Sequence, residues 1–486
     1  MPSSLTADIK QQYIDANQEH LFAYWDELSL EEQSEFLSQL SQFEDPLELV
    51  STVQKAINFS KSNCSMARNF KPLPVQSHSS LLEEPAENVA QWEREGLELI
   101  NRGEVGVILM AGGQGSRLGS CAPKGCYDIG LPSHKSLFQI QAEKIMRVVK
   151  LSNETFHNNN ARVTWYIMTS IATRKITENY FIDNNYFGLN KNHIIFFNQG
   201  TFPCFSIDGS KILLNSKNSI CESPDGNGGL YKGIYSSKLL EDFDQKNIKH
   251  IHMYCVDNCL ARVADPTFIG WSARNKYDLS TKVVRKRNAS EKVGLIVLDT
   301  DRNCPCVIEY SEISKELSEK QDENGNLYLK AANIVNHYYS VDLLKKEIPK
   351  WIKSQEFLPF HIAKKKVSVL NPQNPNTKIT PIEPNAIKLE QFIFDVFPSI
   401  PLSKFGCLEV DRHEEFSPLK NGPEIPIDSP QSARLDSLKL GTKWILQNGG
   451  KLDNENSLVE VSSLTSYKGE DLEFVKGKTY KDGDIV

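Results

Sequence analysis

The chain of 486 residues is long enough for a large α/β core and for more than one domain. Lys and Arg total 55 against 62 Asp and Glu, so the net charge is −7 and no basic excess is available to bind nucleic acid. The first residues are polar, so we expect no signal peptide. The sequence has no apolar run long enough to span a membrane, so we expect no membrane helix. The ten scattered cysteines predict free thiols in a reducing compartment, for which we expect the cytoplasm.

Residues 1–100 are predicted to be mainly helical. In SLEEQSEFLSQLSQF, Ser29 and Glu32 have the spacing of a capping box. The apolar residues that follow fall on one helical face and are Phe36, Leu37, Leu40 and Phe43. The segment AENVAQWEREGLELIN predicts another helix, which ends at Gly103 and leads into the strand VGVIL.

Strand-like and helix-like runs alternate beyond this point. The strand-like runs are RVTWYIMTS (162–170), NHIIFFNQG (192–200) and HIHMYCVDN (250–258), with a helix-like run at 233–249. This alternation predicts parallel strands joined by crossover helices, whereas 293–299 and 306–314 predict an antiparallel excursion. We therefore expect an α/β fold with a Rossmann-like, mixed but mainly parallel sheet. The expected division is a helical N-terminal region (1–100), a core (101–395) and a small C-terminal domain (396–486).

The stretch MAGGQGSRLGSCAPK (110–124) places four glycines directly after a predicted strand. Such a loop lets backbone N–H groups converge on an anion. It lacks the G-x-x-x-x-G-K-[ST] of a Walker A loop, and Leu118 stands where the dinucleotide fingerprint G-x-G-x-x-G needs its last glycine. A plain glycine-rich turn is the structural alternative, but it accounts for neither Arg117 nor Pro123-Lys124.

Several motifs together carry a resemblance to a known family. They are GGQGSRLG with PK, KGCYDIGLPSHKSLFQI, SPDGNGGLY, YCVDN, VIEYSEIS, AANIVNH, AIKLEQFIFD and EEFSPLKN. In this order, from about residue 100 to 450, they resemble the eukaryotic UDP-N-acetylglucosamine pyrophosphorylases. The resemblance implies a nucleotidyltransferase core.

The resemblance also implies a reaction. UTP and N-acetylglucosamine 1-phosphate would give UDP-N-acetylglucosamine and pyrophosphate, by in-line attack on the UTP α-phosphorus with Mg²⁺ (or Mn²⁺). A broader UDP-sugar or UDP-glucose pyrophosphorylase stays open, and so does a non-catalytic nucleotide-sugar-binding regulator.

The resemblance assigns the nucleotide site residue by residue. Arg117 and Lys124 would hold the departing pyrophosphate, and Asp257 would bind the metal at the nucleotide. The other implied nucleotide contacts are Met110, Ala111, Gly112, Gly113, Gln199 and Gly226, the last two at the uracil, with Lys388 at the phosphates. The alternatives are a strand-end polar residue for Gln199, an Asx turn for Asp257 and an ordinary surface lysine for Lys388.

The implied sugar site consists of Asn227, Glu309, Tyr310 and Asn333, with Lys420 at the sugar phosphate. DGNGG alone would predict a tight turn, and Asn227 can serve both purposes. The family commonly shows Gly where this chain has Ala332, so we expect the extra methyl group to narrow the N-acetyl pocket. A surface position is the alternative for Lys420.

Overall fold

The computed structural model describes residues 3–43, 45–63, 69–115, 118–120, 122–310 and 312–486, without the side chains of 3–6 and 61–63. The chain packs into two compact units. Unit 1 consists of residues 1–67, 199–232 and 351–395, and unit 2 of residues 68–198, 233–350 and 396–486. Neither unit is a continuous stretch of chain. The expected division into domains at residues 100 and 395 stays a prediction.

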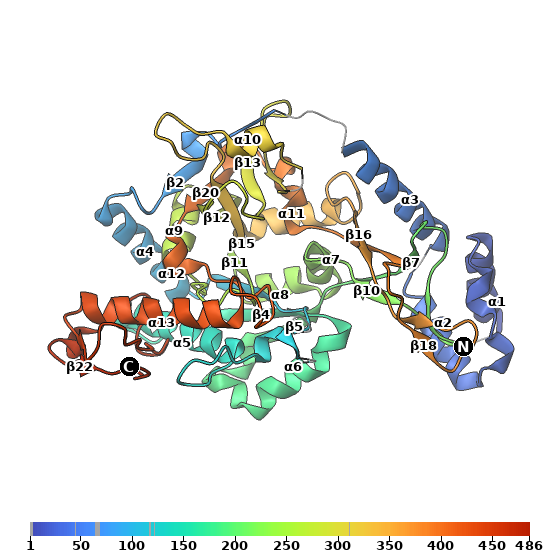
Figure 1. Ribbon diagram of the computed structural model, residues 1–486, viewed down its shortest axis with the longest axis horizontal. Coiled ribbons are helices and arrows are strands. Elements are labelled where there is room, and N and C mark those ends of the chain that lie inside the picture. The colour runs from blue at the N-terminus through green and yellow to red at the C-terminus, as the bar shows by residue number, and fades with distance from the viewer. Residues whose placement is uncertain (1–2, 44, 64–68, 116–117, 121, 311) are drawn as a thin grey trace. The chain divides into compact units, whose positions relative to one another are not determined.

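Unit 2 is built on one 11-stranded sheet (Figure 1). Its main strands are β2 (His78–Ser80), β3 (Val105–Met110), β4 (Thr164–Thr169), β5 (Ile194–Asn198), β11 (His250–Cys255), β12 (Leu279–Arg285), β15 (Ala331–Ser340) and β20 (Phe405–Glu409). Their order is β2-β20-β12-β15-β11-β3-β4-β5. β15 is antiparallel to both neighbours, and the other pairs along this order are parallel. The predicted mixed, mainly parallel sheet is confirmed.

An antiparallel group extends this sheet. β13 (Leu295–Asp299) pairs with β14 (Cys304–Ile308), with β15 and with the short β1 (Phe70–Lys71). The predicted antiparallel excursion is therefore confirmed. β3 and β4 are buried along their whole length, which is the reason for their unbroken apolar sequences.

Helices cover the sheet of unit 2. They are α4 (Ala86–Asn101), α5 (Leu137–Phe156), α6 (Ile171–Asp183), α8 (Leu239–Gln245), α9 (Pro266–Arg274), α10 (Lys315–Glu319), α12 (Arg412–Glu415) and α13 (Pro430–Gln447). α7 (Gly229–Ser236) and α11 (Val341–Trp351) cross from one unit into the other. The single helix expected over 233–249 is instead two, because Lys238 takes a left-handed conformation with φ of 54°.

The sheet reverses its strand order beside β3. The chain runs from β3 to β4 and β5 on one side, and β11 then pairs with the other side of β3. In open α/β sheets, ligands bind at the carboxyl ends of the strands where the order reverses in this way. The carboxyl ends of β3 and β11 are therefore the place to look for a site.

The last part of unit 2 packs around α13. Ser429 caps this helix, and β21 (Lys451–Leu452) pairs in parallel with β22 (Thr479–Tyr480). Buried Leu438, Ile445 and Leu472 share one apolar cluster with Leu137 at the start of α5.

Unit 1 combines three helices with small antiparallel sheets. The helices are α1 (Ser3–Asp15), α2 (Leu30–Leu40) and α3 (Pro46–Asn63). The strands are β6 (Thr201–Pro203), β7 (Phe205–Ser206), β8 (Leu214–Ser216), β9 (Ser219–Ile220), β10 (Glu222–Pro224), β16 (His361–Lys365), β17 (Val369–Leu370), β18 (Lys378–Ile379) and β19 (Ala386–Glu390). The predicted capping box of Ser29 and Glu32 is present. Phe36 and Leu40 of α2 share a core with Phe202 and Ile387.

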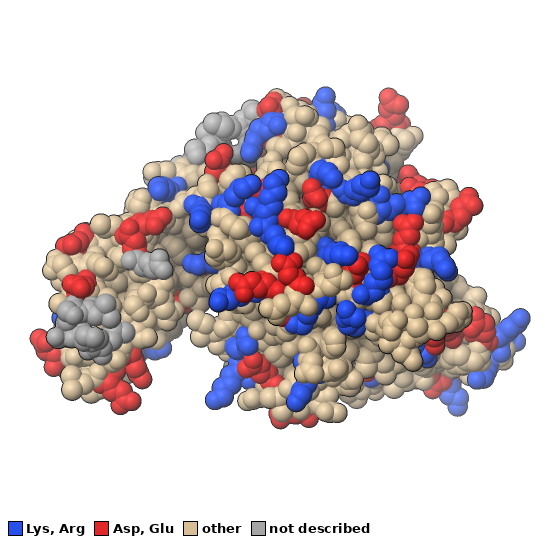
Figure 2. All heavy atoms as spheres, turned by 180° about the vertical axis from the view of Figure 1, so that it is seen from behind, with Lys and Arg blue, Asp and Glu red and all other residues tan. Residues whose placement is uncertain are grey.

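Charged side chains are mixed over the face shown in Figure 2, where Lys and Arg alternate with Asp and Glu. Among the described residues, no helix has the length and apolar character needed to cross a membrane.

Candidate active site

The loop that follows β3 folds back on itself. The amide of Gly115 donates to the carbonyl of Ala122 at 3.0 Å, and the amide of Lys124 donates to the carbonyl of Gly113 at 3.3 Å. In the described part of the chain, nothing beyond its own neighbours lies within 4 Å of where a Cβ on Gly113 would stand. This backbone therefore borders open space, as a loop that binds phosphate requires.

The side chains at the start of this loop belong to the core. Met110 and Ala111 are buried, and the Ala111 amide donates to the carbonyl of Met168 at 2.8 Å. Gly112 is buried as well, whereas Gly113 is exposed, so the Gly113 backbone is the part of this stretch that a ligand can reach directly. Arg117 lies outside the described residues, so its assignment to pyrophosphate stays a prediction.

Lys124 and Asp257 meet at the carboxyl ends of β3 and β11. The Lys124 ammonium lies 3.7 Å from Asp257 Oδ2 and donates to the carbonyl of Leu419 at 2.8 Å. The amide of Leu419 in turn donates to the carbonyl of Asp257 at 2.9 Å. Two sequence-predicted residues more than 100 positions apart are thus brought together, and the Leu419 backbone joins them.

The Asx turn proposed as an alternative for Asp257 is made by its neighbour. The side-chain oxygen of Asn258 accepts from the amide of Leu260 at 3.3 Å and from the amide of Ser417 at 3.0 Å. Its amide nitrogen donates to the carbonyl of Glu415 at 2.7 Å. Asn258 therefore fixes the turn, and the Asp257 carboxylate is left facing Lys124.

Lys420 follows directly on this fixed segment. Its ammonium lies 5.7 Å from the centre of the Phe416 ring, and its amide donates to the carbonyl of Asp428. Burial raises the pKa of the nearby Cys255 thiol, as does the charge of Asp257, whereas the charges of Lys124 and Lys420 act in the opposite direction. Lys420 is also the next residue after Leu419, whose backbone joins Lys124 to Asp257.

The donor set suits a hard divalent cation that brings most of its own ligands. Across the described ranges, no group of three or more His, Cys, Asp or Glu side chains could hold a metal ion. Mg²⁺ is commonly held by one or two carboxylates together with water and substrate phosphates. The single carboxylate of Asp257 fits that arrangement.

Two predicted sugar-site residues converge on Gly294 in unit 2. The amide of Asn333 donates to the carbonyl of Gly294 at 2.9 Å. A Cβ on Gly294 would lie only 2.8 Å from Glu309 Oε1, so the missing side chain leaves room for this carboxylate. Tyr310, next to Glu309, is 48% exposed.

The structure corrects the expectation for Ala332. Its side chain is fully buried among Val284, Leu295 and other core residues. Successive strand residues point to opposite faces, so Ala332 faces away from the side of Asn333. The methyl group therefore packs in the core and does not form the wall of a sugar pocket.

A bulge in β15 sets the direction of Asn333. Between the pairs Thr281–His337 and Val283–Asn333, β15 contains more residues than β12. Val335 in this bulge has a φ of 53°, which is unusual for a β-branched residue, and its amide donates to Asn333 Oδ1 at 2.9 Å. Bulges often redirect a side chain next to a functional site.

The predicted loop PDGNGG lies in unit 1, where it packs on the end of β19. Gly226 has a φ of 89°, and a Cβ there would lie 2.4 Å from the carbonyl oxygen of Gln391. Asn227 Oδ1 accepts from the amide of Ile393 at 3.0 Å. Asn227 thus helps to hold the turn, and its amide nitrogen remains as the group that could donate to a sugar.

Gln199 and Lys388 also belong to unit 1. Gln199 follows β5 and is 8% exposed. Lys388 lies in the middle of β19, and its charge lowers the pKa of the Cys204 and Cys221 thiols, although burial raises both overall. The Lys388 side chain makes no hydrogen bond or ion pair with the residues that the structure describes, so its charge is available to a phosphate.

Asp225 is a residue that sequence reasoning missed. Its carboxyl group is squeezed between Gly200 and Gly229, whose Cβ positions would lie 2.3 and 1.9 Å from its oxygens. Burial raises its pKa to about 6, and Oδ1 has no hydrogen-bond partner among the described residues. The sequence did contain a signal for this residue. Asp225 lies between Pro224 and Gly226, and an acidic residue between such turn-forming residues indicates a close-packed turn.

Comparison with known proteins places this chain in a family. A sequence model described as UTP–glucose-1-phosphate uridylyltransferase matches residues 50–438, and the chain belongs to that family of nucleotidyltransferases. Within it, the chain groups with the eukaryotic UDP-N-acetylglucosamine pyrophosphorylases, as the motifs predicted.

Three relatives illustrate the similarity. The UDP-N-acetylglucosamine pyrophosphorylase of Saccharomyces cerevisiae is 52% identical over 485 residues, which is 99% of each chain. UDP-N-acetylglucosamine diphosphorylase 2 of Arabidopsis thaliana is 39% identical over 96% of this chain and 91% of its own length. The crystal structure of the Trypanosoma brucei UDP-N-acetylglucosamine pyrophosphorylase has a TM-score of 0.83 and 26% identity, covering 98% of this chain and 95% of its own.

Proposed function

We propose that this chain transfers the uridylyl group of UTP to N-acetylglucosamine 1-phosphate, producing UDP-N-acetylglucosamine and pyrophosphate. The observation that carries the proposal is the meeting of Lys124 with Asp257 beside Lys420 at the strand-order reversal. The names of the full-length relatives support the choice of substrates.

The reaction needs charge and position more than a protein nucleophile. A sugar-phosphate oxygen attacks the α-phosphorus, the new P–O bond forms, and the bond to the β-phosphate breaks as pyrophosphate leaves. Lys124, with Arg117, binds the departing pyrophosphate, and Lys420 binds the sugar phosphate. Mg²⁺ (or Mn²⁺) held at Asp257 would supply charge neutralisation at the triphosphate.

The remaining residues bind and orient the substrates. Backbone amides at Gly112 and Gly113 receive the nucleotide, while Gln199 and the Gly226 turn are assigned to the uracil. Lys388 is assigned to the UTP phosphates. On the sugar, the Asn227 amide donates, the Glu309 carboxylate accepts from ring hydroxyl groups, and Asn333 and Tyr310 contact the hexosamine.

One assay tests the proposal. The protein is incubated with UTP, Mg²⁺ and either N-acetylglucosamine, N-acetylgalactosamine or glucose 1-phosphate, and pyrophosphate release is measured. We expect N-acetylglucosamine 1-phosphate to give the highest kcat/KM, because a site that bonds the amide leaves polar groups unpaired when glucose binds. Equal rates would favour a broad UDP-sugar pyrophosphorylase, and binding without release would favour a non-catalytic regulator.

We also propose that the protein works in the cytoplasm. Cys126, Cys204, Cys221, Cys255, Cys259 and Cys407 are free thiols, which is typical of proteins in a reducing compartment.

A further inference from the structure

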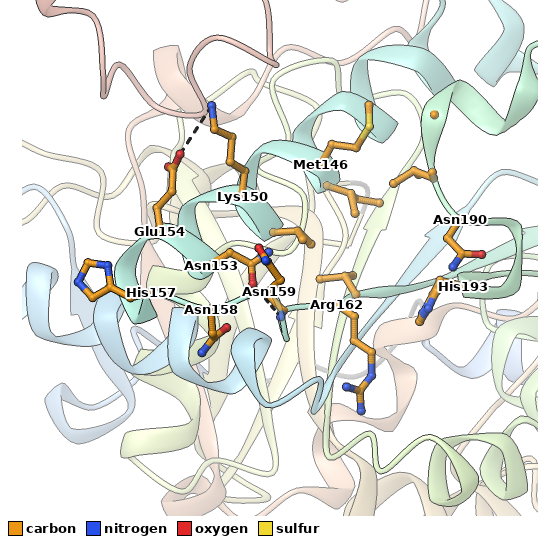
Figure 3. Close-up of a pocket in the computed structure, with 16 residues that line it drawn as sticks. Met146, Lys150, Asn153, Glu154, His157, Asn158, Asn159, Arg162, Asn190 and His193 are labelled. Carbon is orange, nitrogen blue, oxygen red and sulfur yellow. Dashed lines mark hydrogen bonds and ion pairs between the residues drawn. The ribbon is translucent and has the colours of Figure 1, made fainter.

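A cavity lies in unit 2, apart from the glycine loop. Its volume is about 750 Å³, which is typical of small-molecule sites. Figure 3 shows walls from the end of α5, from the loop before β4 and from the segment before β5. The cavity therefore lies at the amino-terminal ends of β4 and β5, whereas Gly112 and Asp257 follow the carboxyl ends of their strands. Six residues of β4 span about 20 Å, so a ligand here does not touch the reacting phosphates.

The cavity wall contains two asparagine side chains whose oxygen atoms already accept hydrogen bonds, whereas their NH₂ groups are left to donate. Asn153 Oδ1 accepts from the amide of Ala161 at 3.0 Å, and Asn190 Oδ1 accepts from the amide of Asn192 at 3.0 Å. The two side-chain NH₂ groups have no acceptor among the described residues. The buried Nδ1 of His193 also lacks a partner there, and it is a third donor in the tautomer that carries its proton on Nδ1. A ligand rich in acceptor oxygens would satisfy these groups.

The charges of the lining favour an anion. Its one carboxylate, Glu154, lies 3.7 Å from Lys150, as the dashed line in Figure 3 marks. The Arg162 guanidinium lies against Gly103 and forms no ion pair within the described ranges. Burial lowers the pKa of His193, and the positive charge of Arg162 lowers it further. Arg162 is thus an uncompensated cation close to His193.

A strained turn holds one wall in place. Four consecutive residues, from Asn185 through Gly188, have φ between 49° and 86°. Tyr186 and Phe187 are bulky residues for this conformation, which is costly outside glycine. The Phe187 ring packs at 5.0 Å from that of Phe181, and this core contact offsets the strain. Such strain is often found at ligand sites, and here it sets the position of Leu189 on the cavity wall.

We propose that this cavity is a second ligand site that binds a small organic anion. The carboxylate or phosphate group of the ligand accepts from Arg162 and His193, and other acceptor atoms of the ligand accept from the side-chain NH₂ groups of Asn153 and Asn190. Its apolar part packs on Val149 and Leu189 of the wall. A bidentate, charge-assisted contact with a planar guanidinium is the strongest single contribution.

Calorimetry with defined probes tests this proposal. Phenyl phosphate and benzoate present one ring with either anionic group, and benzyl alcohol presents the ring without charge. The titrations are made with saturating UTP present and again on Lys124→Ala, so that phosphate binding at the catalytic site is recognised. We expect at least one anion to bind at millimolar concentration under both conditions, and benzyl alcohol to bind more weakly.

Matched variants locate the binding. Arg162→Ala should weaken the anion by about tenfold or more, since a hydrogen bond to a charged group is lost. Leu189→Trp should place a larger ring in the part of the cavity that the apolar part of the ligand occupies, and should weaken binding. Lys175→Ala removes an exposed cation of α6 outside the cavity and should change nothing. Circular dichroism checks that each variant is folded.

The outcomes separate this site from the catalytic one. Binding that UTP or Lys124→Ala removes would assign the anion to the catalytic site and overturn the proposal. Absence of binding by both anions, or equal affinity in wild type and Arg162→Ala, would overturn it as well. The calorimetric experiment does not measure turnover. The anion-binding result can therefore be interpreted even if the uridylyl-transfer assay fails.

Discussion

At the scale of single residues, Lys124 shows how the site is prepared before substrate arrives. Its ammonium donates to the Leu419 carbonyl and faces Asp257, so it is already turned toward the edge where phosphates would bind. A charged donor held in place costs little reorganisation during the reaction.

Lys124→Ala should lower kcat by on the order of 10²–10³, because a preorganised donor to a developing anion is removed. Lys124→Arg should recover part of the loss by restoring the charge. Steady-state kinetics at saturating UTP measure the effect, and Lys175→Ala serves as the control for loss of a lysine elsewhere. Near-normal turnover of Lys124→Ala would remove the residue from the proposed mechanism.

The hydrogen bond from Lys124 to the Leu419 carbonyl could not be predicted from the sequence. The motifs assigned Lys124, Asp257 and Lys420 to one site by resemblance, and the structure joins Lys124 and Asp257 through Leu419, the residue before Lys420. The joining group, however, is a backbone carbonyl 295 positions away from Lys124. A main-chain atom of Leu419 leaves no signature in the sequence, because any residue could supply it.

At the scale of elements, long apolar runs were predictable and short ones were not. β3 and β4 are six-residue buried strands with continuous apolar sequence, and both were predicted. The two-residue strands β7 and β17 carry no periodicity, and they help to build unit 1 from three separate stretches. β15 lies in the middle of the sheet and runs against its neighbours, a direction that strand propensity cannot give.

The turn at Gly226 provides a test of this packing. Gly226→Ala adds a Cβ 2.4 Å from the Gln391 carbonyl at a φ of 89°, so the loop must move. Gly477→Ala is the matched control, since Gly477 has a φ of 77° but nothing within 4 Å of the Cβ position in the described structure.

We expect Gly477→Ala to lose about 1 kcal/mol from the left-handed conformation alone. Gly226→Ala should lose more and should also raise KM for UTP. Urea denaturation and steady-state kinetics measure the two effects. Equal stability losses with an unchanged KM would mean that the turn tolerates the shift and does not contact the nucleotide.

At the scale of the whole molecule, buried histidines determine the response to acid. Burial lowers the pKa of His250 and His252 to about 4 and that of His337 to about 3. Below pH 6.5 these histidines bind protons in the unfolded chain, whereas in the native state they stay neutral until about pH 4 or lower. The free energy of unfolding therefore falls as the pH is lowered toward 4. Asp225 acts in the opposite sense, because its raised pKa lets the native state bind a proton first.

The expected result is a melting temperature that declines as the pH is lowered from 6.5 to 4. His337→Phe removes one of these groups while keeping a ring beside Phe397. It should make the decline shallower, by on the order of 1–3 kcal/mol over this range. Thermal denaturation followed by circular dichroism provides the comparison, and parallel curves for both proteins would contradict the assignment.

The interleaving of the two units has a consequence in time. The helices α1–α3 leave the ribosome before the later parts of unit 1, yet Phe36 of α2 packs with Phe202 and Ile387. More than 300 residues separate α3 from Ile387, so at about 5–20 residues per second the growing chain waits on the order of 15–60 s for this partner. During that interval the apolar face of α2 lacks its native cover, which makes the nascent chain a natural client for a chaperone.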